Sequence, residues 1–168
     1  MSEMTQTMDQ AVKAMANRTA KYLTFRLANE EYGIEILKVQ EIIGVMAITP
    51  VPRMPEFIKG VINLRGHIIP VVDIRLKLSM GEAARTEETC IIVVKARELE
   101  MGIIVDRVSE VADIASGDIQ DAPSFGHGVN TEYILGIGKS AGKVRLLLDI
   151  DRVLSNKDVI DLKTAGAA

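Results

Sequence analysis

The stretch that decides the fold is YLTFRLANEEYGIEILKVQEII, residues 22–43, because its pattern recurs later in the chain. It aligns without a gap on IIVVKARELEMGIIVDRVSEVA, residues 91–112, at a shift of 69 residues, from 22 to 91. Gly33 falls on Gly102, and Glu41 falls on Glu110. Two copies of one short pattern predict that one supersecondary unit is built twice.

A second block repeats in the same order. FIKGVINLRGHIIPVVDI, residues 57–74, aligns on YILGIGKSAGKVRLLLDI, residues 133–150, at a shift of 76 residues, from 57 to 133. The larger shift places 7 extra residues in the second copy, within GDIQDAPSFGHGVNTE, residues 117–132. Six recurring glycines are predicted to serve structural turns and hairpins: Gly33, Gly60, Gly66, Gly102, Gly136 and Gly142.

Short runs rich in β-branched residues, broken by turn formers, predict strands rather than helices in both copies. The predicted strands of the first copy are residues 22–27, 31–36, 41–48, 58–64 and 68–72. Those of the second copy are residues 90–96, 100–105, 110–115, 134–138 and 144–148.

Five short strands per copy are too few for a large sheet, and closure into a small barrel removes exposed strand edges. The sequence therefore predicts a mainly β fold with two five-stranded β-barrel subdomains, residues 21–78 and 89–150. Because each barrel alone would be marginally stable, we expect both to pack into one body within residues 21–154. The polar run SMGEAARTEE, residues 79–88, is expected to cross between them.

The two ends of the chain are expected to lie outside this body. Residues 1–20 are predicted to form a flexible N-terminal tail, and residues 155–168 a helix end followed by a tail. Short helices are expected at the connections and at the C-terminus. A helical face is predicted there from the spacing of Ile150, Val153, Leu154 and Ile160.

Composition narrows the function classes. The formal net charge is -3, Lys and Arg are scattered, and aromatic residues are only 4% of the chain, so nucleic acid is not an expected partner. The only cysteine, Cys90, lies in an apolar run and is interpreted as a small buried hydrophobe. The sequence contains no secretory signal and no run of about 20 apolar residues, so a cytoplasmic protein is expected.

Catalytic and metal-binding patterns are weak. His67 and His127 have no His or Cys partner at metal-ligand spacing, so neither a metal nor another cofactor is expected. GKSAGK, residues 138–143, has one residue too few between its glycines for a phosphate-binding loop and lacks the following Ser or Thr. Asp73 and Asp149 each follow a predicted strand and are interpreted as helix caps or turn residues rather than a catalytic pair.

Function is expected where the two copies differ. Asn63-Leu64-Arg65-Gly66 in the first copy corresponds to Lys139-Ser140-Ala141-Gly142 in the second, so Arg65 has no basic counterpart. An arginine able to reach Glu41 would form a charge-assisted bond that fixes the neighbouring surface. A solvated turn arginine is an equally simple interpretation.

These residues also carry a family resemblance. Three stretches carry it, which are EEYGIEILKVQEI, residues 30–42, KGVINLRGHIIPVVDIR, residues 59–75, and GIIVDRVSEV, residues 102–111. Together they closely resemble the CheW coupling proteins of bacterial chemotaxis. The resemblance covers residues 22–154, and its most specific element is NLRG followed by Pro70 and Asp73.

The resemblance implies two SH3-like barrels with a groove between them and a non-catalytic adaptor function without cofactors. It implies two partners, which are the cytoplasmic tips of methyl-accepting chemoreceptors and the regulatory domain of the histidine kinase CheA. It also implies association with membrane-bound receptor arrays, without membrane insertion. The receptor-binding residues that it implies are Val39, Glu41, Ile42, Arg65, Val105, Val108 and Val111.

Two alternatives remain open. One is a CheW-like scaffold of a chemosensory pathway other than motility. The other is a small nucleotide-binding enzyme that uses the loop of residues 139–143. Val39 and Val108 are also ambiguous, because residues shared by both copies are explained by the fold alone, whereas the resemblance assigns them to the groove.

Overall fold

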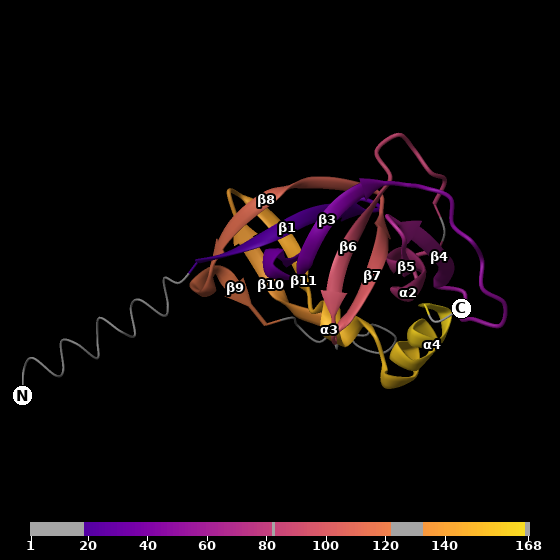
Figure 1. The fold of residues 1–168 in the computed structure, drawn as a ribbon. Coiled ribbons are helices and arrows are strands. Elements are labelled where there is room, and N and C mark those ends of the chain that lie inside the picture. Colours follow the sequence, from indigo (N-terminus) through magenta and orange to yellow (C-terminus); the bar gives the residue numbers. More distant parts are fainter. Residues whose placement is uncertain (1–18, 82, 122–132, 167–168) are drawn as a thin grey trace, which may run out of the picture.

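The computed structural model describes residues 19–81, 83–121 and 133–166, which form two β-sheets and a few short helices (Figure 1). Within these residues no helix is both long enough and apolar enough to cross a membrane. The mainly β fold predicted from the repeated strand pattern is confirmed.

The first sheet, here called sheet A, has six strands. In spatial order they are β8 (Arg107–Ala115), β1 (Thr19–Leu27), β2 (Glu30–Glu35), β11 (Lys143–Leu148), β10 (Ile134–Ser140) and β9 (Ile119–Gln120). All neighbours are antiparallel except β11 and β2, which are parallel. The two-residue strand β9 was not predicted, because two residues carry no periodicity.

The second sheet, here called sheet B, has five strands. In spatial order they are β3 (Val39–Gly44), β6 (Cys90–Ala96), β7 (Leu99–Val105), β5 (His67–Asp73) and β4 (Ile58–Leu64). Its only parallel pair is β5 with β7. The strand order matches that of sheet A position by position once equivalent strands of the two copies are exchanged.

Each sheet takes strands from both copies of the repeat, so the predicted subdomain boundaries are wrong. Sheet B is built from residues 39–105, and sheet A from residues 19–35 together with residues 107–148. Each copy gives its first hairpin to one sheet and its other strands to the other sheet. The reason is that both copies carry the same pairing pattern, and therefore nothing in that pattern requires a copy to pair with itself.

The run at residues 79–88 consequently does not cross between the sheets, because the strands on either side of it, β5 and β6, both belong to sheet B. The chain passes between sheets at two other points. One is the 3-10 helix η1 (Ile36–Lys38), and the other is Asp106, between β7 and β8. A second 3-10 helix, η2 (Ser116–Asp118), follows β8.

The largest apolar cluster joins the two sheets. Phe25 and Ile34 of sheet A pack in the same cluster as Val94 and Ile103 of sheet B, and all four side chains are fully buried. Each sheet has in addition a smaller cluster of its own. The shared cluster agrees with the prediction of one packed body.

Three α-helices lie within the described residues: α2 (Ile74–Lys77), α3 (Ile150–Val153) and α4 (Asn156–Gly166). Asp73 and Asp149 cap the first two, because their Oδ1 atoms accept hydrogen bonds from the backbone N–H groups of Arg75 and Asp151 at 3.0 Å. The predicted helical face is partly wrong. Ile160 is exposed, and Val159 and Leu162 of α4 are buried instead.

The repeated glycines serve two different purposes. Gly66 and Gly142 follow residues in the left-handed conformation at tight turns and have φ values of 88° and 75°, as predicted for turn glycines. The other four, Gly33, Gly60, Gly102 and Gly136, lie inside the strands of β-hairpins rather than at the turns themselves. At Gly60 a Cβ atom would lie 2.1 Å from the carbonyl oxygen of Thr49, because a preceding segment crosses the strand there.

Candidate docking surface

The turn between β4 and β5 determines where the Arg65 side chain points. Arg65 has a φ of 52°, and the Asn63 Oδ1 atom accepts a hydrogen bond of 2.9 Å from the Gly66 N–H group. From this turn the Arg65 guanidinium donates a hydrogen bond to the Glu41 carboxylate on β3. The predicted charge-assisted pair is therefore formed, although the Arg65 side chain remains 70% exposed.

Two apolar residues are exposed at equivalent places on the edge strands of the two sheets. Ile42 on β3 is 46% exposed, and Val111 on β8 is 50% exposed. In the described part of the chain, β3 and β8 are the end strands of sheets B and A, and in Figure 1 β8 arches over the top of the molecule with β3 below it. Exposed apolar side chains on edge strands are available for contact with another chain.

Val39 and Val108 are half-buried and pack against the shared core cluster. Each precedes a β-bulge at an equivalent place in the two copies, where Gln40 and Ser109 are the extra residues. This packing gives both valines a structural function and leaves part of each side chain accessible. The packing supports the structural interpretation, and contact of these two valines with a receptor stays a prediction.

Val105 does not belong to any accessible surface. Its side chain is fully buried in the shared core cluster at the end of β7. A direct contact of Val105 with a partner is excluded by this burial, which corrects its assignment as a receptor-binding residue. Successive residues of a strand face opposite sides of the sheet, so Val105 faces the core and the preceding residue, Ile104, faces the other side.

Sequence reasoning missed Arg145. Its side chain on β11 is 1% exposed, and its Nε atom lies 3.1 Å from Glu31 Oε2. Its Nη2 atom lies 2.7 Å from Oε1 of Glu110, the counterpart of Glu41. Glu110 is thus bound by a buried arginine, whereas Glu41 is bound by an exposed turn arginine. The signal that could have found it is a basic residue where the first copy has Ile69.

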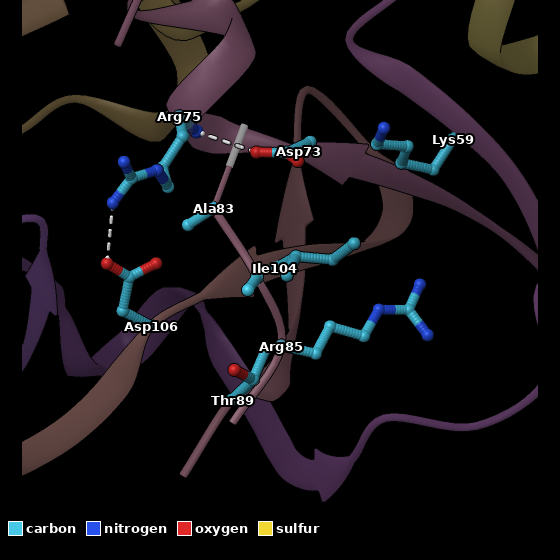
Figure 2. Close-up of a pocket in the computed structure, with 9 residues that line it drawn as sticks. Lys59, Asp73, Arg75, Ala83, Arg85, Thr89, Ile104 and Asp106 are labelled. Atoms are coloured by element: carbon cyan, nitrogen blue, oxygen red, sulfur yellow. Dashed lines mark hydrogen bonds and ion pairs between the residues drawn. The ribbon is translucent and has the colours of Figure 1, made fainter. Parts of the chain in front are cut away.

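A polar hollow of about 220 Å³ lies beside α2. Figure 2 shows residues that line it. In it the Arg75 Nη1 atom lies 2.7 Å from Asp106 Oδ2, and the Asp73 carboxylate is used in capping α2. Lys59 extends from β4 toward this carboxylate, and Arg85 points away from it. The charged groups at the centre of the hollow are therefore engaged with one another rather than arranged around an open reaction centre.

The other candidate chemical groups are not assembled into a catalytic or metal site. Within the described parts of the chain, no three His, Cys, Asp or Glu side chains are placed to hold a metal ion. Burial raises the pKa of the half-buried Cys90 thiol, although a hydrogen bond to the Val108 backbone lowers it in part. His67 is exposed beside the turn, and His127 lies outside the described residues.

The GKSAGK segment forms part of a hairpin. Ser140 pairs with Lys143 across a two-residue turn, and Ala141 and Gly142 both have positive φ values. The segment joins β10 to β11 and does not lead into a helix. A phosphate-binding loop requires a strand-to-helix turn, so the hairpin agrees with its interpretation as a simple turn.

Comparison with known proteins gives the family. A family model described as the CheW-like domain matches residues 21–158. The chain belongs to the CheW-like family. It is 41% identical over 150 residues to a chemotaxis protein CheW of Klebsiella aerogenes, covering 88% of this chain and 90% of that protein. It is 31% identical over 151 residues to a chemotaxis protein CheW of Rhizobium meliloti, covering 90% and 97%.

A solved structure agrees with this assignment. The crystal structure of the scaffolding protein TtCheW from Thermoanaerobacter tengcongensis matches with a TM-score of 0.76 and 34% sequence identity, covering 84% of this chain and 97% of that chain. Membership of the CheW-like family confirms the resemblance found in the sequence. It also confirms the prediction of a non-catalytic adaptor in chemotaxis signal transduction, rather than an enzyme.

Proposed function

We propose that this adaptor couples methyl-accepting chemoreceptors to the histidine kinase CheA, and that the receptor docks on the two edge strands β3 and β8. The observation that carries the proposal is the Arg65–Glu41 pair at β3, where the next residue, Ile42, is exposed on the opposite side of the same edge strand. A charged pair next to an exposed apolar residue is the combination expected at the rim of a docking surface.

The chemistry of the surface suits a helical partner. The tip of a chemoreceptor is a helical hairpin, and an amphipathic helix presents apolar side chains at i, i+3 and i+4. Ile42 and Val111 offer exposed apolar contacts, and the half-buried Val39 and Val108 offer shallower ones. Charges at the rim would fix the register of the helix, because a shift along its axis would separate the paired charges.

The kinase contact would use the regulatory domain of CheA, which is itself CheW-like. Each contact can be weak individually. When one adaptor binds a receptor and a kinase in the same array, the second contact becomes intramolecular, and its effective concentration raises the overall avidity. The adaptor would therefore be located at membrane-bound receptor arrays through its partners rather than by inserting into the membrane.

The proposal is tested by changing Arg65→Ala. We expect at least tenfold weaker binding to a soluble fragment of the cognate receptor, because the rim loses its cation and Glu41 is left without its partner. The thermal unfolding midpoint should change little, since the Arg65 side chain is 70% exposed. Pulldown with the receptor fragment and a thermal melt measure these two effects.

The matched control is Lys139→Ala, which removes an exposed cation beside the equivalent turn of sheet A. This variant should bind the receptor fragment as the wild type does. Control of CheA activity by the receptor, reconstituted from purified components, should be lost without the adaptor and reduced by Arg65→Ala. Unchanged receptor binding by Arg65→Ala in a normally folded protein would contradict the proposed docking surface.

A further inference from the structure

A second hollow, of about 310 Å³, lies against β8 on sheet A, and its lining is almost entirely charged. The hollow is lined by Arg26, Glu31, Arg107, Ser109, Glu110 and Lys143. These residues come from β1, β2, β8 and β11, and Glu110 directly precedes the exposed Val111. Glu110 and Val111 project to opposite sides of the edge strand β8, so the hollow lies across this strand from the Val111 side chain and contains none of the side chains used to argue for the docking surface.

The two carboxylates of the hollow, on Glu31 and Glu110, are already paired with a buried arginine. Buried Arg145 binds Glu31 and Glu110 at 3.1 and 2.7 Å, so its single positive charge is shared by two negative ones. Around them stand the cations of Arg26, Arg107 and Lys143. Together with Arg145 these four cations exceed the two carboxylates, although the whole chain carries a formal net charge of -3.

Two of the rim cations have no partner of their own. Among the residues that the structure describes, neither Arg26 nor Lys143 has a side-chain hydrogen bond or ion pair, and both are exposed. Arg107 forms a pair of 3.1 Å with Glu88, but both of these side chains are more than half exposed, so the pair is readily exchanged. The hollow therefore has two unpaired cations beside the carboxylates of Glu31 and Glu110, which Arg145 holds in place.

From this arrangement we infer that the hollow binds an acidic side chain of the helical partner that docks along the edge of β8. Arg26 and Lys143 are the binding residues. Arg145 is a positioning residue, because it keeps the carboxylates of Glu31 and Glu110 from turning toward the rim and neutralising those cations. The inference rests on the proposed receptor docking and identifies the chemistry of one contact within it.

The sheet B counterpart gives a matched control. Lys95 on β6 is equivalent to Arg26 at the shift of 69 residues, and it is also exposed. The position equivalent to Arg145 is Ile69, which is buried in an apolar cluster, so sheet B has no buried cation holding acceptors there. Changing Lys95→Glu therefore alters the net charge by the same amount as Arg26→Glu without affecting the hollow.

The experiment measures binding of a soluble fragment of the cognate chemoreceptor to the full chain at low and moderate salt. Lys143→Glu and Arg26→Glu should each weaken binding at least tenfold and reduce its salt dependence, whereas Lys95→Glu should leave both within a factor of two. Single Glu→Lys and Asp→Lys changes in the receptor fragment should include one that restores binding to Lys143→Glu. Thermal melts verify that all variants are folded.

The outcomes separate the inference from the function on which it rests. If the wild type binds the fragment and Lys143→Glu binds equally well, the inference is overturned and receptor coupling stands. An equal loss with Lys95→Glu also overturns it, because the effect would then be one of net charge. If the wild type does not bind the fragment, receptor coupling itself fails, and the inference fails with it.

Discussion

The two sheets share one pattern of strand pairing, but equivalent buried positions are apolar in sheet B and polar or charged in sheet A. In sheet B, Ile62 pairs with Ile69 across β4 and β5, and both are buried in an apolar cluster. In sheet A the equivalent pair is Gly138 and Arg145 across β10 and β11. Thr24 replaces Val93 in the same way, and its hydroxyl bonds the backbone of Glu110. One register thus supports two different interiors.

The comparison teaches that the repeated backbone does not require an apolar core in both sheets. Among the described residues, the apolar cluster confined to sheet A is smaller, and its buried members are Tyr22, Ala112, Ile114 and Leu147. Stability there depends more on the shared cluster and on the paired charges of Arg145. Charged hollows lie on both sheets, but only the hollow of sheet A has carboxylates held by a buried arginine, so the difference is connected to the proposed binding chemistry.

The largest effect is expected when the buried arginine of sheet A is introduced at the equivalent position of sheet B. Ile69→Arg places a guanidinium among Ile62, Val71 and Ile91, which are all buried apolar residues. We expect a loss of more than about 5 kcal/mol in the free energy of unfolding, because a buried charge without a partner is strongly unfavourable. Circular dichroism should show an unfolded or aggregated chain at 25 °C. A folded variant would mean that sheet B tolerates charge as sheet A does.

The reverse change should have a smaller effect. Arg145→Leu removes the cation and leaves Glu31, whose side chain is 14% exposed, without its partner. We expect a loss of about 3 kcal/mol, measured by urea denaturation. Adding Glu31→Gln should recover part of it, because the remaining buried group is then uncharged. Stability equal to the wild type in Arg145→Leu would show that the charge cluster makes no net contribution.

The smallest of these effects concerns Lys77, whose counterpart at the shift of 76 residues is the buried Val153. Lys77 Nζ lies 2.7 Å from Asp158 Oδ2 on α4 and 4.5 Å from the centre of the Phe57 ring. Burial by itself would raise the pKa of Asp158, but the hydrogen bonds from Lys77 and Ser155 outweigh it and hold that pKa below its ordinary value.

Because the folded pKa of Asp158 is depressed, its carboxylate stabilises the fold above the unfolded pKa, and this stabilisation disappears as the pH falls through the folded value. Asp158→Asn should therefore be less stable than the wild type by about 2 kcal/mol at pH 7. The difference should shrink below about pH 4. Urea titrations at several pH values measure it, and a difference independent of pH would rule out the carboxylate as its cause.

The sequence was sufficient to predict every strand longer than two residues in the described part of the chain, because the alternation of apolar residues and the turn formers occurs twice and each copy supports the other. The Arg65–Glu41 pair was also found, since the difference between the copies marks Arg65 as unusual. The family followed from the NLRG motif and its surroundings. The strands and turns are local features, and local sequence determines them, whereas the Arg65–Glu41 pair joins residues 24 apart and was found only by comparing the two copies.

Which strands pair over long distances could not be found in this way. A duplicated pattern specifies the register between strand types, but it does not distinguish a partner in the same copy from the identical partner in the other copy. The same limit explains Val105, since its burial depends on a neighbouring sheet. It also explains Arg145, whose partners Glu31 and Glu110 lie far away in the sequence and on other strands.

The nested arrangement of the sheets has a consequence for synthesis on the ribosome. Residues 39–105 are contiguous, so all five strands of sheet B have emerged before any of β8 to β11. The hairpin of β1 and β2 is made first, yet it waits for residues beyond 107 to complete its sheet. Since pairings between distant residues form slowly, the earliest segment of this fold is among the last to reach its final neighbours.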